Sequence, residues 1–142
     1  MADYVTLLVY EVLEKVVKAK TRKEKIDVMR QNESQALKDV LMGTFDSRVE
    51  WNLPEGRPPF EPAPEENPPT NLLKHTGNFN EFVKGGPGDN QPAFRREATF
   101  IRLIEKIHPK DAEVILTMVS KKSLGKGITK KLVEEAFPGL IH

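Results

Sequence analysis

The chain of 142 residues contains no cysteine, and this absence excludes several kinds of site at once. Without thiols there is no disulfide framework, thiolate zinc site, iron–sulfur centre or cysteine nucleophile. Long hydrophobic runs are missing as well, since no stretch approaches the roughly 18 consecutive apolar residues that a membrane span needs. The first residues lack a basic segment followed by an apolar run, so no signal peptide is predicted and the protein is expected in the cytoplasm.

An excess of one charge is also absent, because 22 Lys and Arg stand against 21 Asp and Glu for a formal net charge of +1. On its face this balance argues against general binding to nucleic acid, although it says nothing about local patches. A hydrophobic content of 38% with 30% charged residues is typical of a soluble, highly charged domain. We therefore expect one domain over residues 1–142, with a modest core.

No segment shows the alternation of a half-buried strand, whereas apolar residues recur at helical spacing along the chain. Capping residues, glycines and prolines indicate where the helices begin and end. The first predicted helix covers residues 4–17, with Asp3 as its N-cap, and the second runs from Thr21 to about Arg30. The third is capped by Asn32 and ended by Gly43. Further helices are predicted at 70–83, at about Pro92 to Ile107 with Phe94 on the apolar face, from Pro109, and from Thr129 to Phe137. The sequence predicts an all-α fold, a compact bundle of about six to seven helices.

Two loops are expected to interrupt this bundle. Seven of the eleven prolines lie between Pro54 and Pro69, with four glutamates and a single Arg57. Because proline sustains neither helix nor central strand, we predict an acidic surface loop at about residues 52–70, with a Pro-rich ligand for a partner as the alternative. A Gly-rich stretch predicts a second loop at about residues 85–91.

Catalytic groupings are absent from the sequence. His75, His108 and His142 have no carboxylate or second histidine at metal-ligand spacing. The glutamates Glu134 and Glu135 follow two lysines by four residues, which favours an ion-paired helix face. No nucleophile elbow or phosphate loop occurs. We therefore predict no enzyme, no metal, no cofactor and no small-molecule substrate.

The most distinctive segment is 121–131, which holds five lysines and no acid in eleven residues between two predicted helices. Its glycines permit positive φ and a close approach of the backbone, and a helix beginning at its end directs free amides outward. Lysines release counterions when they meet a nucleic-acid backbone. The alternative is an ordinary lysine-rich turn after a glycine-terminated helix. The predicted DNA contacts are Lys121, Lys122, Ser123, Gly125, Lys126, Gly127, Thr129, Lys130 and Lys131.

A second basic run near the start of the chain supports this interpretation. Seven basic residues between Lys15 and Arg30 stand against Glu24 and Asp27 alone. The Pro-rich loop holds much of the compensating acid, so the net charge averages over an uneven distribution. The sequence therefore predicts a second basic patch at Lys18, Lys20, Arg22 and Lys23.

The end of the chain resembles a known domain. Leu124-x-x-Gly127-Ile128-Thr129 is followed after seven residues by Phe137-Pro138-Gly139-Leu140-Ile141. This pattern is similar to the close of the N-terminal DNA-binding domain of ATP-dependent DNA ligases, in the short version found in T-even phages. The stretch from Lys23 to Asp46 is similar to the early helix pair of the same domain, whereas about Leu53 to Gln91 has no match.

The resemblance implies an all-α domain that binds duplex DNA across the minor groove through its backbone, without reading sequence. It also implies that Lys122, Leu124, Gly127 and Thr129 lie in the backbone-contacting turn. The adenylated-lysine motif of those ligases, Lys-x-Asp-Gly, does not occur in this sequence, so the chain is not expected to seal nicks.

Two hypotheses of function follow from the sequence. The first is a non-enzymatic phage protein that binds double-stranded DNA, alone or beside a replication, repair or transcription protein. The alternative is an interaction adaptor or regulator whose partner is a host or phage replication or transcription protein, or a virion component. Its predicted contacts are Trp51 and Phe60, aromatic side chains in or beside the Pro-rich loop.

Overall fold

The computed structural model describes residues 7–141, apart from the side chain of Thr76. Within this range the chain forms six α-helices, three short 3-10 helices and no strand, so the predicted all-α bundle is confirmed. The predicted N-cap Asp3 lies outside the described residues. The helices are α1 (Val9–Lys18), α2 (Arg22–Gln31), α3 (Gln35–Phe45), η1 (Leu72–Lys74), η2 (Thr76–Phe82), η3 (Pro87–Asn90), α4 (Ala93–Lys106), α5 (Pro109–Val119) and α6 (Lys130–Ala136).

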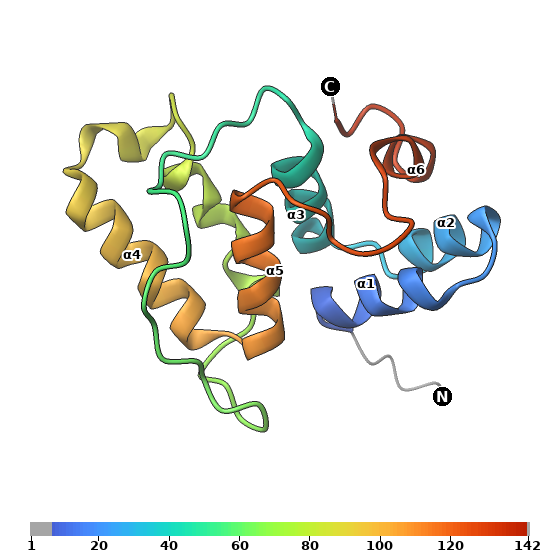
Figure 1. Ribbon diagram of the computed structural model, residues 1–142, viewed down its shortest axis with the longest axis horizontal. Coiled ribbons are helices and arrows are strands. Elements are labelled where there is room, and N and C mark those ends of the chain that lie inside the picture. The colour runs from blue at the N-terminus through green and yellow to red at the C-terminus, as the bar shows by residue number, and fades with distance from the viewer. Residues whose placement is uncertain (1–6, 142) are drawn as a thin grey trace.

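The bundle has two ends on either side of a central pair of helices (Figure 1). α1, α2 and α6 lie at one end, α4 lies at the other, and α3 and α5 lie between them. α5 packs against α1, α3 and α4, a central place that suits a helix apolar nearly all round. Leu37 and Leu41 of α3 and Ile115 and Met118 of α5 are fully buried. No helix in the described range is long and apolar enough to cross a membrane.

Three helices begin at the predicted residues. The Thr21 side chain accepts a hydrogen bond from the N–H of Glu24 at 3.1 Å. Thr129 caps α6 in the same way, through the N–H of Leu132 at 3.2 Å. α5 begins with Pro109, and the preceding His108 accepts from the N–H of Lys110 at 3.0 Å through Nδ1. Side chains that accept from the free amides of a first turn stabilise a helix start.

The predicted cap of the third helix is wrong. Ser34 caps α3, accepting from the N–H of Leu37 at 3.0 Å. Asn32 ends α2 instead, and its Nδ2 donates to the carbonyl of Val28 at 2.9 Å. Asn and Ser are both good N-caps, and local preference does not choose between two candidates so close together.

Gly43 does not end α3, which continues to Phe45. A Cβ at residue 43 would lie 2.6 Å from Cζ2 of Trp51 and 2.7 Å from Sδ of Met118. The Trp51 indole N–H donates to the carbonyl of Gly43 at 2.9 Å. Gly43 is therefore a position of close packing inside a helix, where the sequence suggests a terminator.

The stretch from 70 to 83 is less regular than predicted. Leu72, Phe79 and Phe82 are buried, as their spacing suggests. The backbone around them forms the 3-10 helices η1 and η2 in place of one α-helix. Over so short a stretch, apolar spacing identifies the buried side chains but does not separate three residues per turn from 3.6.

Residues 52–70, here named the Pro-rich strap, run in extended form beside α4 and α5 (green in Figure 1). The strap is held along its length, because backbone and side-chain groups bind to both helices. Its contacts are Arg57 with Glu113 of α5, the N–H of Glu61 with Oε2 of Glu105 at 2.8 Å, and the N–H of Thr70 with the carbonyl of Lys106 at 3.0 Å. The predicted loop is thus an ordered cover over two helices.

Candidate nucleic-acid interface

The lysine-rich turn begins with Lys121, two residues after the last residue of α5. Its φ of 51° lies in the left-handed region that glycine usually occupies at this position. The N–H of Lys121 donates to the carbonyl of Met118 at 2.9 Å, and the N–H of Lys122 donates to that of Thr117 at 3.1 Å. These paired bonds form a Schellman motif, which satisfies carbonyls that the helix leaves free.

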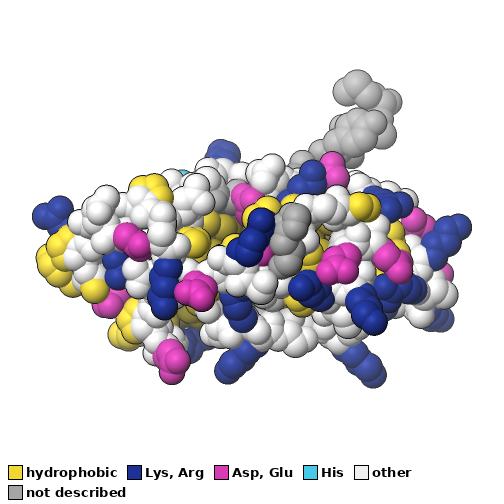
Figure 2. All heavy atoms as spheres, turned by 90° about the horizontal axis from the view of Figure 1, so that it is seen from above, with side chains coloured by type: hydrophobic (Ala, Val, Ile, Leu, Met, Phe, Trp, Pro, Cys, Tyr) yellow, Lys and Arg dark blue, Asp and Glu magenta, His cyan; other side chains and the backbone are white. Residues whose placement is uncertain are grey.

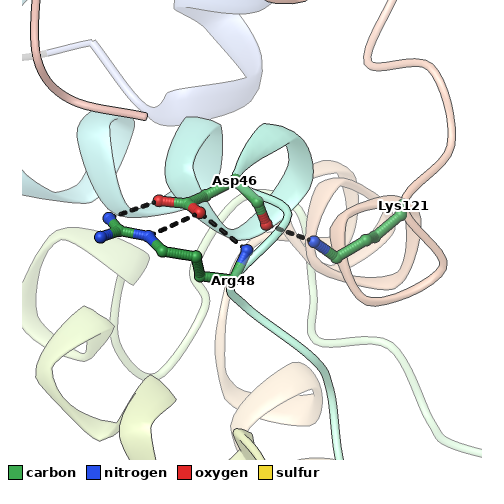
Figure 3. A network of polar contacts seen from close by, with 3 residues as sticks. All are labelled: Asp46, Arg48 and Lys121. Atoms are coloured by element: carbon green, nitrogen blue, oxygen red, sulfur yellow. Dashed lines mark hydrogen bonds and ion pairs between the residues drawn. The ribbon is translucent and has the colours of Figure 1, made fainter. Parts of the chain in front are cut away.

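The side chain of Lys121 is also bound within the protein (Figure 3). Its Nζ donates to the carbonyl of Asp46 at 2.7 Å, and burial lowers the pKa of Lys121. The buried Asp46 carboxylate accepts from the N–H, Nε and Nη2 of Arg48 at 2.9 to 3.2 Å. This network joins the end of α3 to the end of α5, so Lys121 acts as a structural contact.

Gly125 and Gly127 permit the expected close approach, but the groups that they approach are α1 and α2. Gly125 has a φ of +150°, and a Cβ there would lie 2.5 Å from Cγ2 of Val17. Gly127 has a φ of +83°, and a Cβ there would lie 3.2 Å from Cε of Lys25. The Nζ of Lys25 in turn donates to the carbonyls of Val16 and Val17, at 2.8 and 3.3 Å. The two glycines therefore place the turn on the junction of α1 and α2.

The two hydroxyl residues of the turn serve its local geometry. Ser123 Oγ accepts from the N–H of Gly125 at 3.2 Å. Thr129 Oγ1 accepts from the N–H of Leu132 at the start of α6. Both hydroxyls are used within the turn and its helix, and the exposed groups that remain on the turn are lysines.

Two arginines join α2 to α6. Arg22 pairs with Glu135 at 3.0 Å and lowers the pKa of that carboxyl. Arg30 donates to the carbonyls of Glu135 and Ala136 at 2.9 and 3.0 Å, at the end of α6. Arg22 of the second basic patch is thus neutralised by an ion pair, whereas the lysines beside it are not.

Among the predicted DNA contacts and the second basic patch, seven exposed lysines have no side-chain ion pair or hydrogen bond within residues 7–141. They come from both basic runs, which the contacts of the two glycines and of Arg22 bring together. In Figure 2, Lys and Arg side chains gather on the half that holds α2 and α6, with some Asp and Glu between them. We name this set the lysine cluster: Lys18, Lys20, Lys23, Lys122, Lys126, Lys130 and Lys131.

The two aromatic residues predicted to contact a partner are packed against the core. Trp51 is fixed by its bond to Gly43, and its ring meets Phe79 edge-on with centroids 6.1 Å apart. Phe60 is half-buried, with the guanidinium of Arg57 over its ring at 5.1 Å. Neither side chain stands free for a partner in this conformation.

The exposed aromatic side chain lies elsewhere, at Phe94 in the first turn of α4. It is 68% exposed, although the sequence suggests that it belongs to the apolar face of this helix. The buried residues of α4 include Phe100 and Leu103, and at 100° per residue Phe94 lies about 120° from Phe100. A helical projection of the sequence therefore contains the signal that Phe94 is off the core face.

The described part of the chain contains no candidate site for a metal ion. No group of three or more His, Cys, Asp or Glu residues between 7 and 141 is arranged to hold a metal ion. His108 caps α5, and Nε2 of His75 lies 3.0 Å from Oγ1 of Thr70. His142 lies outside the described residues.

The fold and the site together define a small all-helical protein with a lysine-rich end and an acidic, Pro-rich strap. Residues 12–126 match the sequence profile of a family of unknown function, DUF6433, and the chain belongs to this family because the match spans most of its length. The matched region includes the whole strap and the lysine-rich turn as far as Lys126. A comparison with curated proteins found no match.

Proposed function

We propose that this protein binds double-stranded DNA through the phosphate backbone, without reading base sequence, and that the lysine cluster is its contact surface. The observation behind the proposal is that basic runs from both ends of the chain lie together and leave the seven lysines of the cluster unpaired. Unpaired, exposed lysines gain free energy from counterion release when they meet phosphates. The resemblance to the DNA-binding domain of ATP-dependent ligases supports the same ligand.

Duplex DNA is favoured over single strands by the kinds of side chain at this end of the molecule. Proteins that bind single strands without sequence preference stack bases on exposed aromatic rings. Among the described residues, the exposed aromatic side chain is Phe94. It belongs to α4, at the end of the molecule away from α2 and α6. Lysines alone suit a regular double helix, whose phosphates present a continuous charged surface.

The same proposal implies where the protein acts and beside which kinds of protein. The protein acts without catalysis, in the cytoplasm of a host cell if it is a phage protein, alone or beside a replication, repair or transcription protein. Contacts across the minor groove and near nicks are the mode that the ligase resemblance suggests. Comparison of intact and nicked duplexes of one sequence tests that mode.

The experiment is a titration of a short fluorescent duplex, followed by anisotropy from about 50 to about 200 mM salt. The test variant is K122Q/K126Q/K130Q, which removes three charges from the lysine cluster. The matched control is K74Q/K84Q/K106Q, which removes three charges from exposed lysines elsewhere. We expect the test variant to reduce the log–log salt slope by about 2 to 3, and the control to change it little.

Several results of this titration would overturn the proposal. Absence of binding at the lowest salt, or equal loss of slope in the two triple variants, removes the lysine cluster as a DNA site. Two unrelated duplex sequences should bind alike, since no base contact is proposed. Tighter binding to a single strand than to its duplex would contradict the choice of ligand.

A further inference from the structure

One face of α4 is covered over only part of its length. Phe94, Glu97, Ile101 and Glu105 follow one another by three or four residues, so they form one stripe. The Pro-rich strap covers the C-terminal part of the stripe, where the N–H of Glu61 binds Glu105 at 2.8 Å. The N-terminal part lies open, as the 68% exposure of Phe94 shows.

An apolar pocket of about 270 Å³ lies beside the open part of the stripe, between the strap, α4 and α5. It continues into a groove of about 890 Å³, because Leu53, Leu116 and Val119 line both. Figure 2 shows hydrophobic side chains at the surface of the half that holds α4. The apolar lining includes Leu53, Pro58, Phe100, Ile101, Leu116 and Val119.

The rim of the pocket is negative. Glu55 and Glu97 line it, and neither carboxylate has a hydrogen bond or ion pair among residues 7–141. The one cation in the lining, Arg57, is neutralised by two hydrogen bonds to Glu113. The rest of the strap adds Glu61, Glu65 and Glu66 without a further base. An apolar cavity with this rim is complementary to an apolar group beside a positive charge.

We propose that the pocket and the open part of α4 form a docking surface for a protein segment that presents an apolar anchor residue beside lysine or arginine. The anchor enters the pocket against Ile101, the basic side chain meets Glu55 and Glu97, and Phe94 packs on the segment. A buried apolar anchor with a charged rim is the usual anatomy of a binding hot spot. None of the cluster lysines lines the pocket itself, whereas Lys122 lines the groove into which the pocket continues.

The chemistry of the pocket is tested with two small probes, phenylbutylammonium and phenylbutyrate, which share an apolar body and differ in the sign of their charge. Each is titrated into the isotopically labelled full chain, and amide shifts are followed. We expect shifts at 53–57 and at Ile101, with the ammonium bound about three- to fivefold more tightly. E55Q/E97Q should abolish this preference, whereas the matched strap variant E65Q/E66Q should retain it.

The nature of the partner is tested by selection of random displayed peptides on the wild-type chain, with I101R as a second target. The proposal expects enriched peptides with an aromatic or aliphatic residue beside lysine or arginine, which fail to bind I101R and weaken on E55Q/E97Q. It is overturned if neither probe shifts these amides, if both probes bind alike, or if no peptide is enriched. Enrichment of acidic peptides, or of peptides that I101R binds equally well, overturns it too.

Discussion

The backbone N–H of Tyr10 donates a hydrogen bond to Oδ1 of Asp111 at 2.9 Å, across 101 residues of sequence. Tyr10 lies in the first turn of α1, whose own N-cap, Leu8, has no side-chain oxygen to offer. Asp111 of α5 therefore caps α1 from another part of the chain. Its carboxylate is fully buried, and Oδ2 has no hydrogen-bond partner within residues 7–141.

This buried carboxylate predicts a stability that falls as pH rises. Burial raises the pKa of Asp111 from 3.8 to about 6, although the Tyr10 N–H opposes the shift. The folded chain thus holds the proton more tightly than the unfolded chain. The resulting stability is fully present below about pH 4 and is lost as pH rises through about 6. We expect the free energy of unfolding to fall by about 2 to 3 kcal/mol from this group between pH 4 and 7, measured by urea titration.

Asp111→Asn isolates this effect, because it keeps the acceptor for Tyr10 and removes the titration. The unfolding free energy of the variant should change little between about pH 5 and 7. Glu66→Gln, an exposed carboxyl on the strap, should leave the wild-type slope intact. The pKa values of Glu113 and Asp89 are lowered, so their contributions change at more acidic pH. Equal slopes in the wild type and Asp111→Asn would contradict the assignment.

Two substitutions at Lys121 separate its hydrogen bond from its backbone conformation. Lys121→Met removes the bond to the Asp46 carbonyl and keeps a side chain in the left-handed region, so we expect a loss of about 1 kcal/mol. Lys121→Gly removes the same bond but relieves a conformational cost of about 1 kcal/mol, so its unfolding free energy should stay near wild type. Urea unfolding measures both.

The same pair of variants bears on DNA binding. Since the ammonium group of Lys121 is engaged by the Asp46 carbonyl at 2.7 Å, we expect neither substitution to alter the salt slope of duplex binding. A slope reduced in both variants would return Lys121 to the contact surface.

Gly125→Ala tests the contact between the lysine-rich turn and α1. The new Cβ would lie 2.5 Å from Val17, at a φ that L residues rarely adopt, so we expect a loss of about 1 to 3 kcal/mol. Val17→Ala should recover part of that loss in the double variant, because it removes the clashing methyl group and leaves the backbone strain. Gly77→Ala, which meets no atom within 4 Å, is the matched control. Additive effects of the Gly125 and Val17 substitutions would contradict the contact.

Local signals in the sequence predict much of this fold. Thr21, Thr129 and the His108–Pro109 pair mark helix starts, because capping depends on residues within one turn. The lysine-rich segment is likewise found at a junction between helices, since its charge pattern and glycines are local features.

Contacts between distant residues leave no such pattern. Lys121 binds Asp46 across 75 residues, and no local feature distinguishes this lysine from Lys122 beside it. The glycines of the turn indicate that something approaches closely, but sequence does not say whether it is a phosphate or Val17. For the same reason, the sequence gives no sign that Asp111 caps α1. These tertiary contacts decide which basic residues remain available to a ligand.

The contact of Gly43 with Trp51 gives a prediction with an optical signal, since Trp51 is the single tryptophan of the chain. Alanine favours a helix interior over glycine by about 1 kcal/mol, so Gly43→Ala would stabilise an uncrowded α3. Here the added Cβ would lie 2.6 Å from the indole ring and 2.7 Å from Met118. We expect this overpacking to win, with a net loss of about 1 to 3 kcal/mol and a red shift of tryptophan emission.

The partner substitution is Trp51→Phe. Because this variant has no tryptophan, its unfolding is measured by circular dichroism. The smaller ring leaves room for the Cβ, so Gly43→Ala should cost less in the Trp51→Phe background than in the wild type. The difference between the two costs measures the coupling of the pair directly. If Gly43→Ala is as stable as the wild type with unchanged emission, the glycine has no packing role and its place inside α3 loses this explanation.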